Sequence, residues 1–509
     1  MEYINKILDL LQYNPKEPLL FNTGLFLFLF LFVALGYFAL RKKLTARLVF
    51  VTLFSYYFYY KSSGAYFCLL AVVTISDWLI AKRIALPFVS KDNSNSEAES
   101  TGEDESKRGN RWWLLLSLVI DLGLLAYFKY TNFFAGLISQ AIGENFQPWD
   151  IFLPAGISFF TFKSISYTID VYRGKMKPVD SLLDYAFYVS FFPVLLAGPI
   201  VRATDFISQI RKPLCITRRM FAFGAYLIII GLFKKMVISD YISANFVSRV
   251  FDNPTLFSGG EILMALYGYS IQLYCDFSGY SDMAIGISAL LGFNIPANFN
   301  APYKADSLSD FWRRWHISLS SWIRDYIYIS LGGNRKGKVR MYLNQMIAMT
   351  LCGLWHGASL NFVLWGVLHG LGVCIHKFFS QSVLHHDRHY HPSGIRRFFA
   401  VILTFHLVTF LWIFFRSQDF QAASLLINQL FSKFDVSLFP AIFAAYKYVF
   451  AIMAFALITH WLPDSWQNRI VSGFEKGGVL VCALALTFII YLAMQVKSSD
   501  IQPFIYLQF

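Results

Sequence analysis

The chain has 509 residues, of which 56% are hydrophobic and only 15% are charged. Ordinary soluble domains do not bury that much apolar surface, so we expect lipid to cover part of it. The formal net charge of +13 suggests nucleic acid as a partner, but the sequence has no arginine-rich module and most basic residues lie between apolar runs. Composition therefore excludes a soluble protein and argues against nucleic-acid binding.

Apolar runs long enough to cross a membrane recur along nearly the whole sequence. A spanning helix needs roughly 20 apolar residues, and we count about eleven such runs. The runs lack the two-residue alternation of a membrane β-barrel, and helices are the other backbone that satisfies its own hydrogen bonds in lipid. We therefore predict an all-α, polytopic integral membrane protein.

Three spans make up the N-terminal part, residues 1–89. The first run covers 19–40 and is followed by four basic residues, Arg41, Lys42, Lys43 and Arg47. Basic residues mark the cytoplasmic side of a span, which places the N-terminus outside. The leader is acidic and its apolar run is long enough to span, so we expect no cleavable signal.

An acidic segment, residues 90–111, separates these spans from the remainder. Six acidic residues lie between positions 92 and 105, among Ser, Asn and Thr. Such a composition lacks the apolar content to pack, so we predict a disordered cytoplasmic loop. The remainder divides into a core, 112–380, which holds nearly all the polar motifs, and C-terminal transmembrane helices, 381–509.

Further spans follow in chain order, together with weaker pairs after residue 340. The clearest cover 112–130, 151–172, 182–201, 219–238, 258–292, 441–461 and 475–495. We find no internal repeat in this series. Because many secondary transporters are built from repeated halves, the lack of a repeat argues against a transporter without excluding one.

Cysteine and histidine spacing gives no sign of a metal site. The six cysteines are scattered without a CxxC pair, so neither a disulfide framework nor a zinc site is indicated. Four histidines crowd one loop, His385, His386, His389 and His391. We interpret them as solvated, although such a cluster binds metal weakly in some proteins.

The segment 306–340 differs from the apolar runs around it. Ser307 followed by Asp310 is typical of a helix start. An apolar stripe recurs every four residues, at Phe311, Trp315, Leu319, Ile323 and Ile327, and a polar, cationic stripe contains Arg313, His316, Ser320 and Arg324. The pattern predicts one amphipathic helix that lies at the membrane interface or re-enters it, with a plain interfacial anchor as the alternative.

A phosphate-loop pattern in this segment is rejected. Gly332, Gly337 and Lys338 satisfy part of it, but position 339 is Val, and an amphipathic helix precedes the loop instead of a strand. Arg335 and its basic neighbours are better interpreted as a cytoplasmic turn near an anionic cofactor or lipid headgroups.

An apolar helix contains the run Leu354, Trp355, His356, Gly357. An ionisable side chain at membrane depth is costly and usually faces the protein interior or a water-filled path. His356 is therefore a functional candidate, with a structural histidine as the alternative. His369 is not distinguished from interior hydrogen-bonding residues by any pattern. No GxSxG elbow surrounds Ser278 or Ser281, so a serine hydrolase lacks its main support.

Several motifs together resemble the membrane-bound O-acyltransferases, specifically the bacterial branch that includes alginate O-acetyltransferases. They are FWRRWHISLS at 311–320, WIRDYIY at 322–328, LGGNR at 331–335, GLWHG at 353–357 and QLYCDFSGYSD at 272–282. LPAGISF at 153–159 and the segments 191–193 and 197–199 also match. The resemblance covers about residues 110–375 and its motifs are highly specific.

The resemblance implies a fold and a site. It implies helices around a central tunnel, with His356 as the catalytic residue and His316 as a second polar residue of the tunnel. Acetyl-CoA is the implied acyl donor, which enters from the cytoplasm, and no bound cofactor is expected. We expect the remaining site residues within the matching motifs, namely Arg313, Arg324, Arg335, Trp315, Trp355, Asp276 and Ser281.

The chemistry of the residues supports this assignment independently. A thioester needs no metal, only an acceptor hydroxyl that loses its proton, and neutral imidazole suits that task near pH 7. Arg313, Arg324 and Arg335 suit the phosphates of the donor because a guanidinium binds phosphate well.

The leading hypothesis is an enzyme of the bacterial plasma (inner) membrane that passes acetyl groups across it for O-acetylation of an exported, alginate-like polysaccharide. A separate SGNH-type protein is expected to complete the transfer, because this chain carries no such domain. The alternatives are a transporter or flippase with His356 and His316 on its path, and D-alanyl transfer to teichoic acid.

Overall fold

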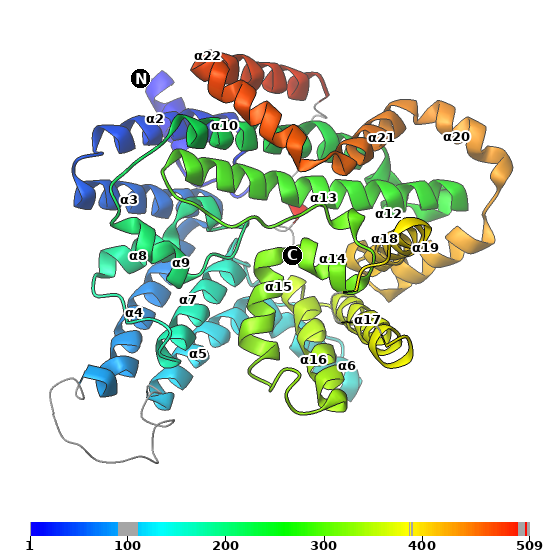
Figure 1. The fold of residues 1–509 in the computed structure, drawn as a ribbon, viewed down its shortest axis with the longest axis horizontal. Coiled ribbons are helices and arrows are strands. Elements are labelled where there is room, and N and C mark those ends of the chain that lie inside the picture. Colours follow the sequence, from blue (N-terminus) through cyan, green and yellow to red (C-terminus); the bar gives the residue numbers. More distant parts are fainter. Residues whose placement is uncertain (1, 90–109, 386, 388–389, 497–503, 506–509) are drawn as a thin grey trace. The chain divides into compact units, whose positions relative to one another are not determined.

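The structure, a computed structural model, describes residues 2–89, 110–385, 387, 390–496 and 504–505 (Figure 1). Every regular element in these ranges is a helix, and they contain no strand. The prediction of an all-α protein is therefore confirmed. The acidic segment predicted as a disordered loop lies outside the described residues, except for Asn110 and Arg111.

Six helices in the described ranges are long and apolar enough to cross a membrane: Leu44–Ala85, Arg111–Ile142, Arg218–Asp252, Leu360–Val383, Gly394–Arg416 and Asp464–Val496. A bent pair, Val436–Ala445 and Lys447–Trp461, makes a seventh if it counts as one span. The expected count of eleven is not confirmed. One reason is visible in the predicted span 182–201, where α8 (Leu182–Ser190) ends shortly before Pro193.

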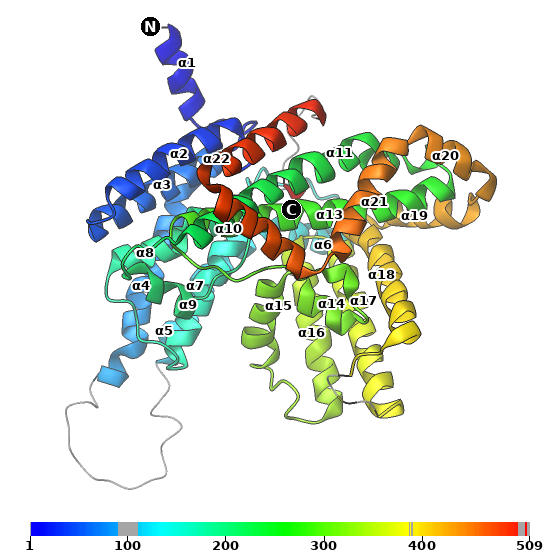
Figure 2. The ribbon, with the colours of Figure 1, turned by 45° about the horizontal axis from the view of Figure 1, so that its top comes forward.

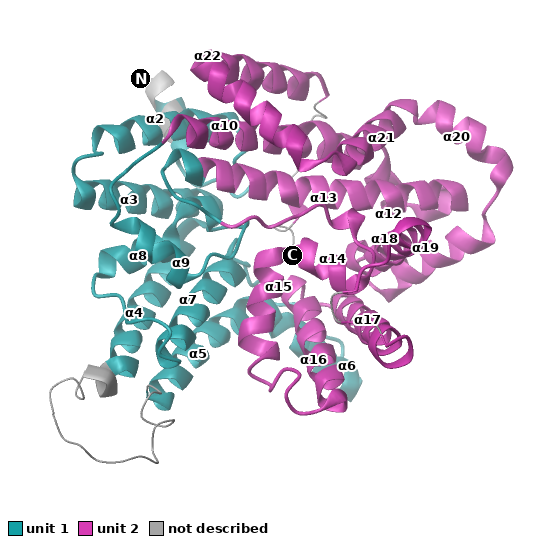
Figure 3. Cartoon of the chain, viewed as in Figure 1, with its two compact units in different colours: residues 1–216, 288–295 teal, residues 217–287, 296–509 magenta. Residues whose placement is uncertain are grey.

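The chain forms two compact units (Figure 3). Unit 1 comprises residues 1–216 and 288–295. Its helices are α1 (Glu2–Leu11), α2 (Gly24–Ala39), α3 (Leu44–Ser63), α4 (Phe67–Val89), α5 (Arg111–Leu125), α6 (Thr131–Ile142), α7 (Ile157–Tyr172), α8 and α9 (Ala203–Ile210). Helices α4, α5 and α7 pack against one another. Between them the buried Ser117 hydroxyl donates to Asp77 at 2.8 Å.

Unit 2 comprises residues 217–287 and 296–509. Its helices are α10 (Arg218–Leu232), α11 (Asp240–Ile242), α12 (Ser248–Asp252), α13 (Gly259–Leu290, whose last three residues fall in unit 1), α14 (Leu308–Arg314), α15 (Ile317–Ile323), α16 (Lys338–His356), α17 (Leu360–Lys377), α18 (Gly394–Arg416), α19 (Phe420–Ser432), α20 (Phe439–Ala445), α21 (Lys447–Trp461) and α22 (Asp464–Val496). Helices α16, α17 and α18 lie side by side in both views (Figures 1 and 2).

The prediction of a single amphipathic helix within the segment 306–340 is wrong. Ser307 does begin a helix, because its side chain accepts from the Asp310 amide at 3.2 Å. The helix stops after Arg314, however, and a second one starts at Ile317. His316 lies between them in the left-handed region, with φ 44°. This break interrupts both predicted stripes, so residues on either side of it do not share one helix face.

Glycines bring α16 and α17 unusually close together. A Cβ atom on Gly353 would lie 2.2 Å from the Phe362 carbonyl oxygen, and one on Gly366 would lie 2.4 Å from the Met349 carbonyl oxygen. Both distances are far below van der Waals contact, so the two backbones approach this closely only because neither residue has a side chain. The close approach fixes the end of α16, where His356 is the last residue.

Candidate active site

His316 is held by a buried asparagine that precedes it in the chain. Its Nδ1 atom lies 3.1 Å from Oδ1 of Asn298. The same oxygen accepts from the Ser318 amide at 3.2 Å and from the Ser318 hydroxyl at 2.9 Å. The Asn298 amide nitrogen donates to the hydroxyl of Ser281 at 3.3 Å. The predicted site residue Ser281 therefore belongs to this network. It contacts Asn298, which in turn contacts the imidazole of His316.

The network determines which nitrogen of His316 carries the proton. A backbone N–H can only donate, so the Asn298 atom that faces the Ser318 amide must be the oxygen. His316 Nδ1 must then donate to that oxygen, and Nε2 is left as the acceptor nitrogen. His316 lies outside the candidate spans, and burial lowers the pKa of its imidazole to about 3. The ring is therefore neutral at ordinary pH.

The ring of Trp355 contacts both predicted catalytic histidines. Its ring centroid is 5.8 Å from that of His316 and 4.9 Å from that of His356. His356 also makes edge contacts with Trp365 at 5.2 Å and with Phe415 at 5.3 Å. The structure thus brings His316, His356 and Trp355 together in the interior of unit 2, where all three are buried.

A third buried histidine, His369, borders the same aromatic cluster. Its Nδ1 atom accepts from the indole nitrogen of Trp312 at 3.3 Å. Its ring lies 4.6 Å from that of Trp365, which is also a neighbour of His356. Apolar periodicity gave no reason to single out His369 among the interior residues. Its place in the site depends on α14 and α17 packing together, which the sequence does not state.

Trp315, another predicted site residue, is completely buried on the far side of the helix break. Its ring packs on Phe311 at 5.5 Å, on Trp412 at 5.2 Å and on Phe299 at 5.1 Å. These contacts hold the backbone on the N-terminal side of His316 in place. The geometry therefore indicates that Trp315 stabilises the backbone at the helix break.

Asp276 forms a buried ion pair. Its Oδ1 atom lies 2.6 Å from Nζ of Lys235, which also lies 2.9 Å from Asp240. The second oxygen of Asp276 accepts from the backbone amide of Ile505 at 2.9 Å. Both carboxylate oxygens are thus engaged by protein groups. Because removing one partner of a buried pair leaves an uncompensated charge, we expect the loss of Asp276 or Lys235 alone to destabilise the local fold.

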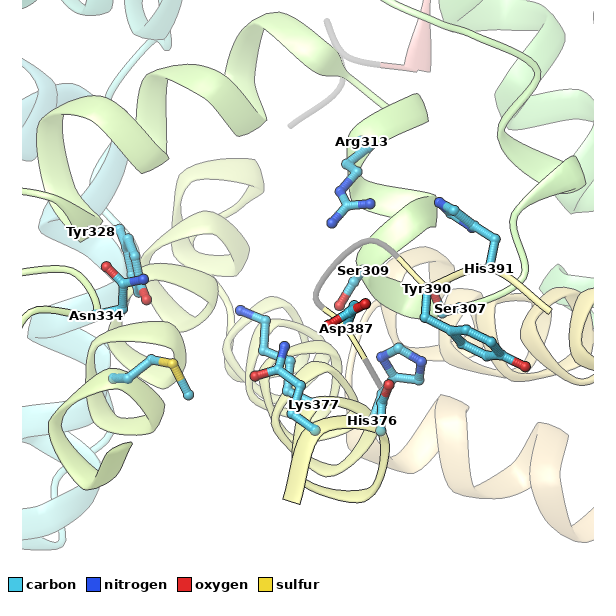
Figure 4. Close-up of a pocket in the computed structure, with 13 residues that line it drawn as sticks. Ser307, Ser309, Arg313, Tyr328, Asn334, His376, Lys377, Asp387, Tyr390 and His391 are labelled. Carbon is cyan, nitrogen blue, oxygen red and sulfur yellow. The ribbon is translucent and has the colours of Figure 1, made fainter. Parts of the chain in front are cut away.

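The three predicted donor-binding arginines lie in different surroundings. Arg313 lines a polar pocket of about 320 Å³ that is formed by α14, α16, α17 and the loop after α17 (Figure 4). Lys377 and His376 also face this pocket. Arg324 instead pairs with its neighbour Asp325 at 2.8 Å on the surface. Arg335 is exposed and is not among the residues that line the pocket.

One group of side chains near this pocket has the composition of a cation site. Ligand atoms of Asp306, Asp310 and His391 lie within 4.8 Å of one another. Asp306 already accepts from His391 at 2.7 Å, and Asp310 accepts from Arg314 at 2.8 Å. Protein partners thus satisfy these carboxylates: the Asp306–His391 contact joins the loop after α17 to the start of α14, and the Asp310–Arg314 ion pair lies within α14.

The fold and these residues define a class of protein. The chain is a multi-pass helical membrane protein with several apolar spans, and it encloses buried imidazole groups among aromatic rings. Such an arrangement suits proton transfer in surroundings that exclude water. The sequence matches the membrane-bound O-acyltransferase (MBOAT) family over residues 178–415, which include His316, His356 and His369.

Comparisons with individual relatives agree. The chain is 38% identical over 420 residues to the probable alginate O-acetylase AlgI of Pseudomonas aeruginosa, which covers 81% of this chain and 75% of that protein. It is 35% identical over 450 residues to the peptidoglycan O-acetyltransferase of Helicobacter pylori, with 82% and 81% covered. The chain therefore belongs to the membrane-bound O-acyltransferase family, and it is an O-acyltransferase.

A more distant relative transfers a different group. The teichoic acid D-alanyltransferase of Bacillus subtilis is 30% identical over 281 residues, which cover 52% of this chain and 69% of that protein. All three relatives are named as enzymes that transfer an acyl group, so the comparisons favour the enzyme over the transporter hypothesis.

Proposed function

We propose that this chain takes an acetyl group from cytoplasmic acetyl-CoA and passes it across the bacterial inner membrane. The final acceptor is an exported or cell-envelope polysaccharide of the alginate type, and a separate SGNH-type protein completes the transfer. The relatives named as alginate and peptidoglycan O-acetylating proteins support an acetyl group and a glycan acceptor. The observation that carries the proposal is the pair His316 and His356, which are both buried and both in contact with the ring of Trp355.

In this proposal His356 acts as the general base. Its neutral imidazole removes the proton from the acceptor hydroxyl while that oxygen attacks the thioester carbonyl. The tetrahedral intermediate then expels the CoA sulfur, which takes up the proton. His316, whose Nε2 atom is an acceptor, orients the hydroxyl or the leaving thiol. The surrounding tryptophan and phenylalanine rings exclude water, which would otherwise hydrolyse the thioester.

Arg313 is the arginine that we assign to the donor. It is exposed to the pocket beside α14 and makes no ion pair with any described residue. Lys377 and His376 line the same pocket, so cationic and polar groups converge on a space large enough for part of a nucleotide. A guanidinium binds phosphate with two parallel hydrogen bonds. The pocket therefore suits the phosphates of acetyl-CoA.

D-alanyl transfer to teichoic acid is the second candidate. It is supported by the D-alanyltransferase of Bacillus subtilis, although that similarity extends over about half of the chain. Acetyl transfer is preferred because the relatives named for acetylation match over four fifths of it or more. The two transferred groups differ in charge, because a D-alanyl group carries an ammonium group and an acetyl group does not.

The test uses the purified full chain in lipid nanodiscs, with membranes of the source cells as the acceptor pool. Acetyl-CoA with a radiolabelled acetyl group is added, and free CoA and label on glycan are measured. We expect CoA release and glycan labelling, both lost in His356→Ala, and no transfer from a D-alanyl thioester. Glycan labelling without release of free CoA, or CoA release that persists in His356→Ala, would contradict the proposal.

A further inference from the structure

Unit 1 contains a second polar pocket. Its volume is about 440 Å³. It is lined by the start of α3, by the end of α9 with the loop that follows, and by residues 291–294. None of these residues belongs to the proposed reaction, and the inference below does not depend on it.

The pocket is closed by specific hydrogen bonds. The hydroxyl of Tyr37 donates to the Leu291 carbonyl at 2.7 Å. The side chain of Gln209 donates to the Asn294 carbonyl at 3.0 Å, and the Asn294 amide donates back to it at 2.8 Å. These bonds fix the loop against α2 and α9. The pocket is therefore a built feature and does not depend on mobile surface side chains.

The unusual member of the lining is Arg47, which is only 3% exposed. Its guanidinium makes no hydrogen bond or ion pair with the described residues, and its Nε atom is completely enclosed without a partner. The contact that it does make is with the ring of Tyr37, whose centroid lies 5.2 Å away. Burying an arginine without a carboxylate is costly, so a buried guanidinium that faces a cavity calls for an anionic ligand.

The charges and the walls of the pocket indicate what kind of anion fits. Lys212 lines the rim, and Asp205, which is exposed, is the one carboxylate in the lining, so the local balance is positive. Leu214, Leu291 and Phe293 supply an apolar wall. A ligand with one negative group and an apolar portion satisfies both surfaces. Basic pockets between helices commonly bind the headgroups of anionic lipids.

We propose that this pocket binds a phosphate group, carried by an anionic phospholipid, with Arg47 as the principal contact and Lys212 as the second. Two parallel N–H bonds from the guanidinium hold two phosphate oxygens. The glycerol portion of the lipid lies against the apolar wall. A bound lipid of this kind fastens the loop 291–294 to α3 and α9.

The chain carries its own reporter for this site. Cys215 is exposed and lines the pocket, whereas Cys68 is exposed elsewhere in unit 1. The purified full chain in detergent is treated with N-ethylmaleimide, with or without short-chain phosphatidylglycerol, and labelling of each cysteine is followed by mass spectrometry. At a lipid concentration of about ten times the dissociation constant, labelling of Cys215 should slow about tenfold. Labelling of Cys68 should not change.

Variants separate the site from general lipid effects. Arg47→Gln should weaken lipid binding by about 10-fold or more, because it removes charge-assisted hydrogen bonds to the phosphate. Lys42→Gln, a basic position of the neighbouring loop outside the pocket, should not. If Arg47→Gln cannot be purified, lipid protection of Cys215 is measured in Lys212→Gln instead, since that exposed side chain is not needed for folding. Unchanged protection of Cys215 in the variant that is tested would overturn the proposal.

Two competitors identify the source of the phosphate. Inorganic phosphate alone is expected to compete weakly, because it lacks the apolar portion. If it protects Cys215 as well as the lipid does, a free phosphate is the ligand and the lipid assignment fails. CoA is expected not to compete. If CoA displaces the lipid at micromolar concentration, the pocket belongs to the donor and the proposal of a separate lipid site is wrong.

Discussion

Asn298 offers a direct test of how the site is organised, because it contacts His316 without being expected to touch substrate. Its side-chain oxygen accepts from His316 Nδ1, from the Ser318 amide and from the Ser318 hydroxyl. Asn298→Leu leaves these donors without their acceptor in buried surroundings. Each unpaired buried donor costs about 1–3 kcal/mol, so the imidazole and the backbone at residue 318 will move to find other partners.

The expected effect on the reaction is a loss of turnover. Without Asn298 the proton of His316 is no longer confined to Nδ1, and the ring is no longer fixed. Removing the partner that orients a metal-bound imidazole typically lowers metal affinity or activity about 10- to 100-fold, and we expect a loss of the same order here. We expect kcat to fall by that factor while the KM for acetyl-CoA changes little, because the donor phosphates bind elsewhere. Free-CoA release by the purified chain in nanodiscs measures both constants.

A conservative variant gives a second readout. Asn298→Asp keeps an acceptor for all three donors but places a carboxylate beside the imidazole, which raises the pKa of His316 from its value of about 3 in the wild type. The variant should be active at high pH. It should lose activity as pH falls through the raised pKa, since His316 then becomes an imidazolium, and the acid limb of its pH profile should lie above that of the wild type.

Asn300→Leu is the matched control, because Asn300 lies two residues away, is exposed and forms its hydrogen bonds with Arg314 through its backbone atoms. It should retain wild-type activity. If Asn298→Leu expresses normally and keeps both the turnover and the pH profile of the wild type, then Asn298 does not position His316 and the tautomer assignment is wrong.

Three further predictions concern other parts of unit 2. His356→Gln keeps hydrogen bonding without accepting a proton, so free-CoA release should fall at least about 100-fold; normal activity at normal yield would exclude it as the base. Arg313→Ala should raise the KM for acetyl-CoA more than it lowers kcat, whereas Arg324→Ala, which removes a surface pair, should do neither in the same kinetic assay. Gly353→Ala places a methyl group 2.2 Å from a carbonyl oxygen of α17 and should lower the thermal unfolding midpoint; Gly123→Ala, which has open space, should not. Equal midpoints for the two variants would mean that α16 and α17 can separate freely.

Apolar composition was enough to predict a helical membrane protein, because lipid permits few alternatives for the backbone. It was not enough to count the spans. Length and hydropathy cannot show that an apolar run is split, as where α8 ends at Ser190 in the run predicted over 182–201. Nor can they show that α2, which extends over 16 residues, is shorter than its apolar run of 19–40.

Motifs and side-chain chemistry indicated which residues to place in the site, and the structure brings His316, His356 and Trp355 together. Other residues of the candidate site are not indicated by any pattern in the sequence. Asn298 lies in an irregular segment before Pro302, and His369 lies on an apolar helix like any interior residue. Both reach the site through contacts between segments that are far apart in sequence, and a periodic pattern within one segment carries no information about such contacts.

The error at 306–340 is instructive because the residue that breaks the helix is also a site residue. A stripe repeated every four residues is ordinarily good evidence for a helix, yet His316 adopts a left-handed conformation that non-glycine residues rarely take. Such strain costs of order 1–3 kcal/mol and persists where surrounding structure imposes it.

The surrounding structure at His316 is substantial. Buried Trp315 packs against five aromatic rings on one side of the break, and the Asn298 network holds both His316 and Ser318 on the other. An unbroken helix would leave the oxygen of Asn298 without these donors. At the break, the backbone of His316 adopts a conformation of higher energy than a helical one. In return, the imidazole has a fixed orientation and a fixed tautomer. The proposed catalytic role of His316, which needs a defined acceptor nitrogen, accounts for that cost, and a simple interfacial anchor does not.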